Sequence, residues 1–157
     1  MEHVIWVIGN DRRDMILAQR KINSTGSMRA FCMLSEAAVH KAVNVQNSNQ
    51  PGLSSFPSLI IMDYQMAHEE DFATLSFIKR QEALAGVPFF IMTEERNQEI
   101  DEICFAKGAM VVLHKPFSAS GILRIEQVAW QHEVTKNYEK MLQKQAGDLQ
   151  AAREIMR

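Results

Sequence analysis

The chain has 157 residues, of which 46% are hydrophobic and 23% are charged, a composition typical of a globular protein rather than a disordered one. Its formal net charge of −2 gives no electrostatic reason to bind nucleic acid or an anionic membrane surface. Cys32 and Cys104 lack metal-ligand spacing, and the first apolar run is too short for a signal peptide or a membrane span, so we expect a cytoplasmic protein.

Short apolar runs alternate with helical patterns along the chain. The runs that predict strands are, in chain order, Val4–Ile8, Arg29–Leu34, Leu59–Met62, Val87–Thr93 and Met110–Lys115. Helices are expected over residues 11–22, 36–45, 70–85 and 96–108, and from residue 116 onward. The polar segment Gln46–Pro57 contains two prolines and predicts a loop. This alternation predicts a doubly wound, five-stranded parallel α/β sheet.

Asp63 follows the third of these runs in the stretch "LIIMDYQM". An ionised carboxylate inside the core would be costly. At the C-terminal end of a parallel strand, however, it would stand in the crevice where open α/β sheets place their chemistry. Asp63 is therefore a candidate functional residue.

Polar residues follow three other strands at the same edge of the predicted sheet. They are Asn10 and Asp11 after the first strand, Thr93 after the fourth and Lys115 after the fifth. A carboxylate can attack a phosphoryl group and carry it as an acyl phosphate, while a lysine and a hydroxyl meet the negative oxygens. Oxygen ligands such as Asp63 and Asp11 also suit Mg²⁺. The set indicates phosphoryl transfer.

The chain from about His3 to Ile125 resembles the receiver domain of bacterial two-component response regulators. The resemblance is carried by "LIIMDYQM", "FFIMT" and "VVLHKPF". Thr93 lies 30 residues after Asp63, and Lys115 lies 22 residues after Thr93, and both intervals are typical of that family. The sequence Lys-Pro-Phe, where the family usually has a cis bond before the proline, is the most specific part.

The resemblance implies a fold, a reaction and a partner. The expected fold is flavodoxin-like, with strand order 2-1-3-4-5 and an extended C-terminal helix. Asp63 would be the phosphoacceptor, Lys115 the phosphate-pairing lysine and Thr93 the hydroxyl that follows phosphorylation. The phosphoryl group would come from a histidine kinase or a phosphotransfer protein.

The resemblance also implies a Mg²⁺ site, at which this sequence departs from the family. The family ends its first strand with two adjacent acids, whereas this chain has Gly9 and Asn10 in the strict register, or Asn10 and Asp11 after a one-residue slip. The ligands implied are Asp11, Asp63, Asn10 and the backbone carbonyl of Gln65. We expect weaker Mg²⁺ binding than an intact acid pair would give.

Further departures surround the motifs. Ala67 replaces the usual proline, Asp71 the usual glycine of the next loop and Glu94 a small residue. Val112 occupies the position of the aromatic ring that reports phosphorylation in the family. A valine cannot move a ring between exposed and buried states, so a signal would have to leave the domain by another route.

We expect two segments, a receiver domain over residues 1–125 and an extended helix over residues 126–157. The helix has a short heptad pattern, which is typical of a coiled coil. Its members are Tyr138, Leu142, Gln145, Leu149, Ala152 and Met156. We therefore expect a homodimer through this helix, which would be a stalk or a linker to an output domain. The alternative is a solvated helix.

Two functional hypotheses remain, and a third lacks support. The first is a signalling receiver that is phosphorylated on Asp63, with at most self-catalysed phosphoryl transfer and dephosphorylation as its enzymatic activity. The alternative is a pseudo-receiver that dimerises or binds proteins without phosphorylation. A flavin- or nucleotide-binding enzyme is disfavoured because "GNDRRD", after the first strand, has a single glycine.

Overall fold

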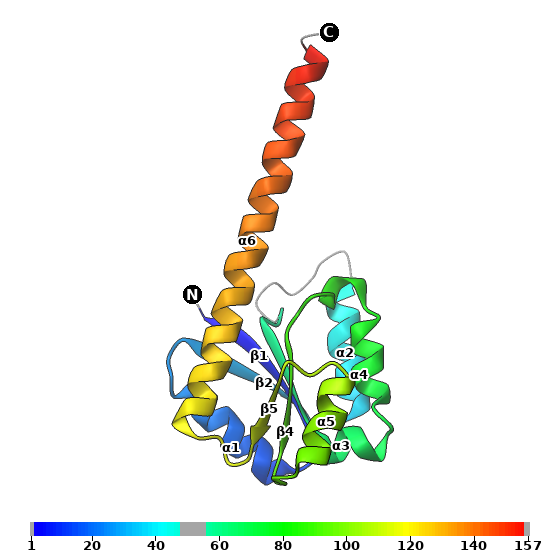
Figure 1. Cartoon of the computed structure of the whole chain (residues 1–157), viewed down its shortest axis with the longest axis vertical. Coiled ribbons are helices and arrows are strands. Elements are labelled where there is room, and N and C mark those ends of the chain that lie inside the picture. The colour runs from blue at the N-terminus through cyan, green and yellow to red at the C-terminus, as the bar shows by residue number, and fades with distance from the viewer. Residues whose placement is uncertain (1, 48–55, 156–157) are drawn as a thin grey trace.

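The computed structural model describes residues 2–47 and 56–155, so most of the predicted loop Gln46–Pro57 and also Met156 lie outside it. Five parallel strands form one sheet in the order β2-β1-β3-β4-β5 (Figure 1). Their bounds are β1 His3–Ile8, β2 Met28–Met33, β3 Leu59–Asp63, β4 Phe89–Thr93 and β5 Val111–His114. The predicted strands, their parallel direction and their order are confirmed.

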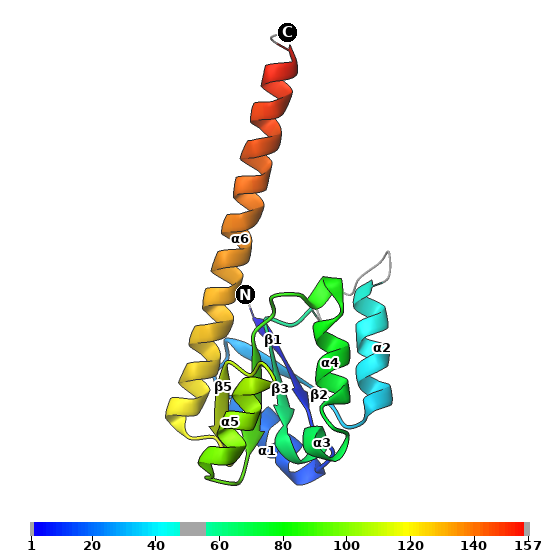
Figure 2. The ribbon, with the colours of Figure 1, turned by 45° about the vertical axis from the view of Figure 1, so that its right-hand side comes forward.

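Helices cover both faces of the sheet. They are α1 Arg12–Asn23, α2 Glu36–Asn47, α3 Tyr64–Glu69, α4 Ala73–Lys79, α5 Gln98–Ala106 and α6 Ala119–Ile155, with a short 3-10 turn, η2, at Glu82–Leu84. The side chains of α1 and α6 pack in one hydrophobic cluster, and those of α2 to α5 pack in another. Figure 2 shows α2 and α4 side by side on their face of the sheet.

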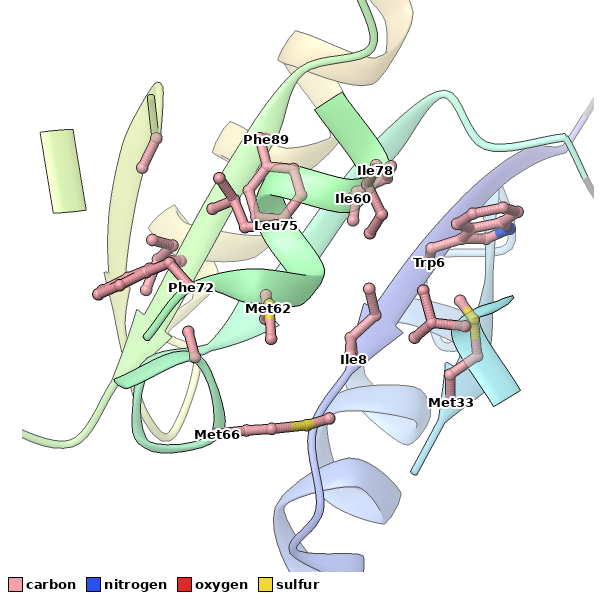
Figure 3. Close-up of a cluster of buried hydrophobic side chains, with 14 of the residues drawn as sticks. Trp6, Ile8, Met33, Ile60, Met62, Met66, Phe72, Leu75, Ile78 and Phe89 are labelled. Carbon is pink, nitrogen blue, oxygen red and sulfur yellow. The ribbon is translucent and has the colours of Figure 1, made fainter. Parts of the chain in front are cut away.

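The central strand β1 shows why both faces must be covered. Trp6 and Ile8 point into the cluster beneath α2 to α5, where Figure 3 shows them beside Ile60 and Met33. Ile5 and Val7 alternate with them and join the cluster beneath α1 and α6. Since successive side chains of a strand point to opposite faces, a continuous apolar run such as "VIWVI" requires helices on both sides.

The predicted single helix over residues 70–85 is wrong. Instead, α3 begins directly after Asp63, and α4 begins only at Ala73. Between them, Asp71 and Phe72 have positive φ angles of 52° and 58°, a left-handed conformation that interrupts a right-handed helix. Phe72 is buried in the core at this break. The spacing of apolar residues in the sequence does not indicate that the helix is interrupted there.

The long helix α6 is fixed to the body along its first five turns. Ile125 and Ala129 are fully buried. Further on, Glu133 accepts a hydrogen bond from the Ser58 hydroxyl at 2.7 Å, and the Lys136 ammonium lies 4.0 Å from the centre of the Phe56 ring. The remaining turns project beyond the sheet (Figure 1). The predicted boundary at residue 125 therefore falls inside a continuous helix whose body contacts reach Lys136.

We expect Ile125→Ala to lower the free energy of unfolding by about 2–5 kcal/mol, because it leaves a cavity where α6 meets the sheet. Gln143→Ala, at an exposed position of the same helix, should change it by only about 0.5 kcal/mol. Urea unfolding of both variants at equal protein concentration measures the difference. Equal losses would contradict the assignment of Ile125 to the α6–sheet contact.

Candidate functional site

Asp63 is the last residue of β3 and the N-cap of α3. Only 3% of its surface is exposed. Its Oδ1 accepts a hydrogen bond from the backbone N–H of Gln65 at 3.2 Å, which is the usual way in which an aspartate satisfies the first turn of a helix. Its Oδ2 takes no part in this cap. Asp63 therefore combines burial with a second carboxylate oxygen that the helix does not use.

Lys115 directly follows β5, and the Lys115–Pro116 bond is cis. Its backbone N–H donates to the carbonyl of Thr93 at 2.9 Å, which ties the end of β5 to the end of β4. Its ammonium lies 3.4 Å from Asp63 Oδ2. The structure therefore places this lysine beside the aspartate, while its role as the phosphate-pairing residue stays a prediction.

The surroundings of Lys115 shift the pKa of its ammonium group. Burial by itself lowers the pKa of this lysine, but the hydrogen bond to Asp14 and the charges of Asp63 and Asp14 outweigh burial and hold the pKa above its ordinary value. The cause is general, since neighbouring carboxylates favour the charged form of an amine. Lys115 therefore keeps its positive charge beside Asp63.

Thr93 is the last residue of β4 and is buried. Its hydroxyl oxygen accepts a hydrogen bond from the backbone N–H of Glu95 at 3.1 Å. A hydroxyl has one hydrogen to donate besides its acceptor capacity. Thr93 therefore lies where the sequence places it, at the same edge of the sheet as Asp63 and Lys115.

Asp11 and Asn10 lie between β1 and α1 and are both exposed. Asp11 is the N-cap of α1, and its Oδ1 accepts from the N–H groups of Arg13 at 2.9 Å and Asp14 at 3.1 Å. One of its oxygens is thus engaged in forming the helix. Its predicted role as a metal ligand stays a prediction.

Gly9 occupies the other position of the expected acid pair, and the packing there leaves little room. A Cβ atom at residue 9 would lie 3.0 Å from the Met15 sulfur and 3.2 Å from the Cβ of Asp63. Both separations are tighter than ordinary van der Waals contact. The close approach of β1 to Asp63 therefore favours a glycine at this position, because any larger residue would have to displace Met15 or Asp63.

The sequence analysis missed Asp14, which lies in the first turn of α1. Its Oδ2 is 2.6 Å from the Lys115 ammonium, closer than Asp63. The signal was present in "DRRD", because residues three apart lie on the same side of a helix and α1 begins at the site. A search for adjacent acids overlooks this carboxylate.

The donor set fits at most a weakly held Mg²⁺ ion. Among residues 2–47 and 56–155, no group of three or more histidine, cysteine or acidic side chains gathers as a metal site. Mg²⁺ can be bound through one or two carboxylates while it keeps several waters. The Asp63 carboxylate satisfies that minimum, although the Lys115 ammonium already faces it.

We expect Gly9→Ala to lower the free energy of unfolding by about 1–3 kcal/mol, because the added methyl group must displace Met15 or Asp63. Gly121→Ala is the matched control, since its Cβ would meet only ordinary contacts at 3.5 and 3.8 Å in the first turn of α6. There alanine should stabilise by up to about 1 kcal/mol. Urea unfolding measures both changes, and a neutral Gly9→Ala would contradict the packing argument.

In the described parts of the chain, no helix is long and apolar enough to cross a bilayer.

Comparisons with known proteins agree on one architecture. No protein-family profile matches the sequence. The two-component response regulator ARR15 of Arabidopsis thaliana is 32% identical over 71 residues, which are 45% of this chain and 34% of that protein. The chain thus matches about a third of the length of this relative.

Solved structures of response regulators match over most of the chain. The chemotaxis response regulator CheY4 of Vibrio cholerae aligns with a TM-score of 0.62 and 18% identity, over 82% of this chain and 99% of that one. The regulator NtrX from Brucella abortus, crystallised with ADP, aligns with a TM-score of 0.66 and 18% identity, over 90% of this chain and 29% of that one. At such identities the likeness establishes architecture alone, and by that architecture the chain has the fold of response regulator receiver domains.

Proposed function

We propose that this chain is a cytoplasmic signalling receiver that accepts a phosphoryl group on Asp63 from a histidine kinase or a phosphotransfer protein. One observation carries the proposal. The buried carboxylate of Asp63, at the C-terminal end of β3, has the Lys115 ammonium 3.4 Å from its Oδ2. A nucleophilic oxygen and a fixed cation then meet at the edge of the sheet where parallel α/β proteins bind ligands.

In the proposed reaction, Asp63 Oδ2 attacks the phosphorus of the donor. A new P–O bond forms, the bond from phosphorus to the donor group breaks, and the leaving group departs with that electron pair. Negative charge spreads over the transferring oxygens, which Lys115 attracts as a nearby positive charge. The Thr93 hydroxyl, whose oxygen accepts from Glu95 in this structure, keeps its hydrogen for a phosphoryl oxygen.

Magnesium belongs to the proposal as a weakly bound cofactor. The ion would neutralise charge on the transferring phosphoryl oxygens. Asp63 would hold it, with Asp11, Asn10 and the backbone carbonyl of Gln65 as the further ligands that the resemblance implies. The engagement of Asp11 in the helix cap and the glycine at residue 9 are consistent with low affinity.

The same two features favour a second candidate function, a pseudo-receiver that works without phosphorylation. Asp11 caps the helix α1, residue 9 is a glycine in place of an acid, and Lys115 is already paired with Asp14. In this alternative the polar residues at the C-terminal edge of the sheet transfer no phosphoryl group, and the chain acts as a binding or dimerisation module. Phosphoryl acceptance separates the two candidates.

We further propose that the chain forms a parallel homodimer through the exposed apolar side of α6. One member of this side, Trp130, also makes an edge-to-face contact with the ring of His3 in β1, with 5.7 Å between the ring centres. At 3.6 residues per turn, the exposed large apolar residues of α6 fall on one stripe, opposite the buried Ile125 and Ala129. The stripe consists of Leu123, Trp130, Val134, Tyr138, Met141, Leu142, Leu149 and Ile155.

A second copy is the occupant that suits this stripe best. The stripe extends along the whole 37-residue helix, and a parallel copy would present an apolar face of equal length to it. It also contains three of the predicted heptad positions, Tyr138, Leu142 and Leu149. The stripe begins earlier than that heptad pattern, at Leu123, so the proposed contact would include the part of α6 that is fixed to the sheet.

Acetyl phosphate is expected to add one hydroxylamine-sensitive phosphoryl group to the protein in the presence of Mg²⁺, because Asp63 offers a carboxylate nucleophile beside Lys115. Asp63→Asn should abolish the addition. Asp71→Asn is the matched control, since Asp71 is exposed and asparagine tolerates its left-handed backbone. Intact-mass measurement decides, and labelling that persists in Asp63→Asn would reject the assignment.

Sedimentation is expected to show a dimer for the full chain and a monomer for a chain that ends at Asn137, which keeps the body contacts of α6. Leu142→Asp with Leu149→Asp should also give a monomer, because charges would be buried in the apolar stripe. Gln143→Asp with Gln150→Asp places the same charges on the other side of the helix and should stay dimeric. A full chain that is monomeric at high micromolar concentration would rule the dimer out.

A further inference from the structure

We propose that Asp14 is a positioning residue that acts as a built-in counter-ion. In the unphosphorylated chain it holds Lys115 partly away from Asp63, and it releases Lys115 when a phosphoryl group is present on Asp63. The inference rests on the proposed phosphoryl acceptance, but its first half, the Asp14–Lys115 pair, can be tested without any phosphorylation.

The distances show which acid binds the lysine more strongly. The ammonium is 2.6 Å from Asp14 Oδ2 and 3.4 Å from Asp63 Oδ2. Charge-assisted hydrogen bonds are short, about 2.7–2.9 Å for N–H···O, so the strong bond is the one to Asp14. The side chains of Lys115, Asp14 and Asp63 are 11%, 21% and 4% exposed, so water screens the pair only in part.

Asp14 supplies the carboxylate that reaches Lys115 from the β1–α1 segment. Residue 9 is a glycine packed closely against Asp63 and carries no acid. Asp11 is turned to the helix end, where its Oδ1 accepts the N–H of Asp14. The cap of Asp11 therefore fixes the turn on which Asp14 lies, and Asp14 is the acid that reaches the site.

Phosphorylation would change the balance of charges around the lysine. One ammonium now faces Asp14 from α1, Asp63 from β3 and, at 3.9 Å, the exposed Glu94 from the β4–α5 loop. A phosphoryl group brings a charge of about −1.5 to −2 in place of the single charge of Asp63. The lysine would then move toward the phosphoryl oxygens, and its bond to Asp14 would lengthen or break.

The exchange would loosen a clasp between α1 and the segment that leads into α6. Two bonds close this clasp, Asp14 to Lys115 and, two turns further along α1, the Lys21 ammonium to the carbonyl of Phe117 at 2.6 Å. A cavity of about 310 Å³ lies between the two sides of the clasp. Loss of the first bond gives α1 room to shift against the loop before α6, and this route needs no aromatic ring at Val112.

The first test follows the Lys115 ammonium by NMR titration of the lysine side chains in the full chain. Asp14→Asn keeps the shape of the side chain and removes its charge, so the Lys115 pKa should fall toward its ordinary value. Glu94→Gln, which neutralises the more distant and exposed acid, should lower it less. Equal shifts, or no shift in Asp14→Asn, would overturn the pairing. Asp14→Glu should keep the pKa raised.

The second test measures the initial rate of phosphoryl acceptance from acetyl phosphate by intact mass. Release of Lys115 in Asp14→Asn should raise the rate about 3- to 10-fold, which corresponds to about 0.7–1.4 kcal/mol. Asp14→Glu should remain close to the unsubstituted chain. Acceptance that appears only in Asp14→Asn would also support a counter-ion that blocks the site.

The outcomes separate this inference from the proposed function. If the unsubstituted chain is phosphorylated and Asp14→Asn is equally fast or slower, the counter-ion role is rejected while the receiver function stands. If neither chain is phosphorylated, the receiver function and the release of Lys115 both fail, and the titration alone reports whether the Asp14–Lys115 pair exists.

Discussion

The candidate site depends on one ammonium group shared among carboxylates that come from different parts of the chain. Lys115 follows β5, Asp63 ends β3 and Asp14 lies in α1, and each contact crosses the edge of the parallel sheet. Because burial of the lysine alone would disfavour its charge, the acids must be present for the cation to persist there. The parallel direction of the strands puts the C-terminal ends of β1, β3 and β5 at one edge, and this arrangement therefore gives the site its electrostatics.

Much of the fold could be predicted, because the strands contain short, mostly apolar runs separated by helical patterns. Runs such as "VIWVI" and "LIIM" lie in β1 and β3, which are buried on both faces. The prediction failed over residues 70–85, where the left-handed turn at Asp71 and Phe72 separates two short helices. In that turn Phe72 is buried in the core. Its burial depends on the whole fold and cannot be read from the local spacing of apolar residues.

The site residues that follow strands could be predicted from the sequence. The contacts that form only when distant elements pack together could not. Asp63 and Lys115 were found at strand ends, and the structure brings them together. Asp14 was missed, because its partner lies 101 residues away in sequence, and a place in the first turn of α1 does not name that partner. The tight packing of Gly9 against Met15 and Asp63 also appears only in the folded chain.

Because α6 is one continuous helix, a tilt where it contacts the body would move its far end by a larger distance. From Lys136, its last body contact, to Ile155 the helix extends for about 28 Å at 1.5 Å per residue. A tilt of about 10° at Lys136 would therefore move the end of the helix by about 5 Å, close to the pitch of one helical turn. A small tilt where α6 meets the body would thus displace the far end of the helix by several ångströms, about the rise of one helical turn.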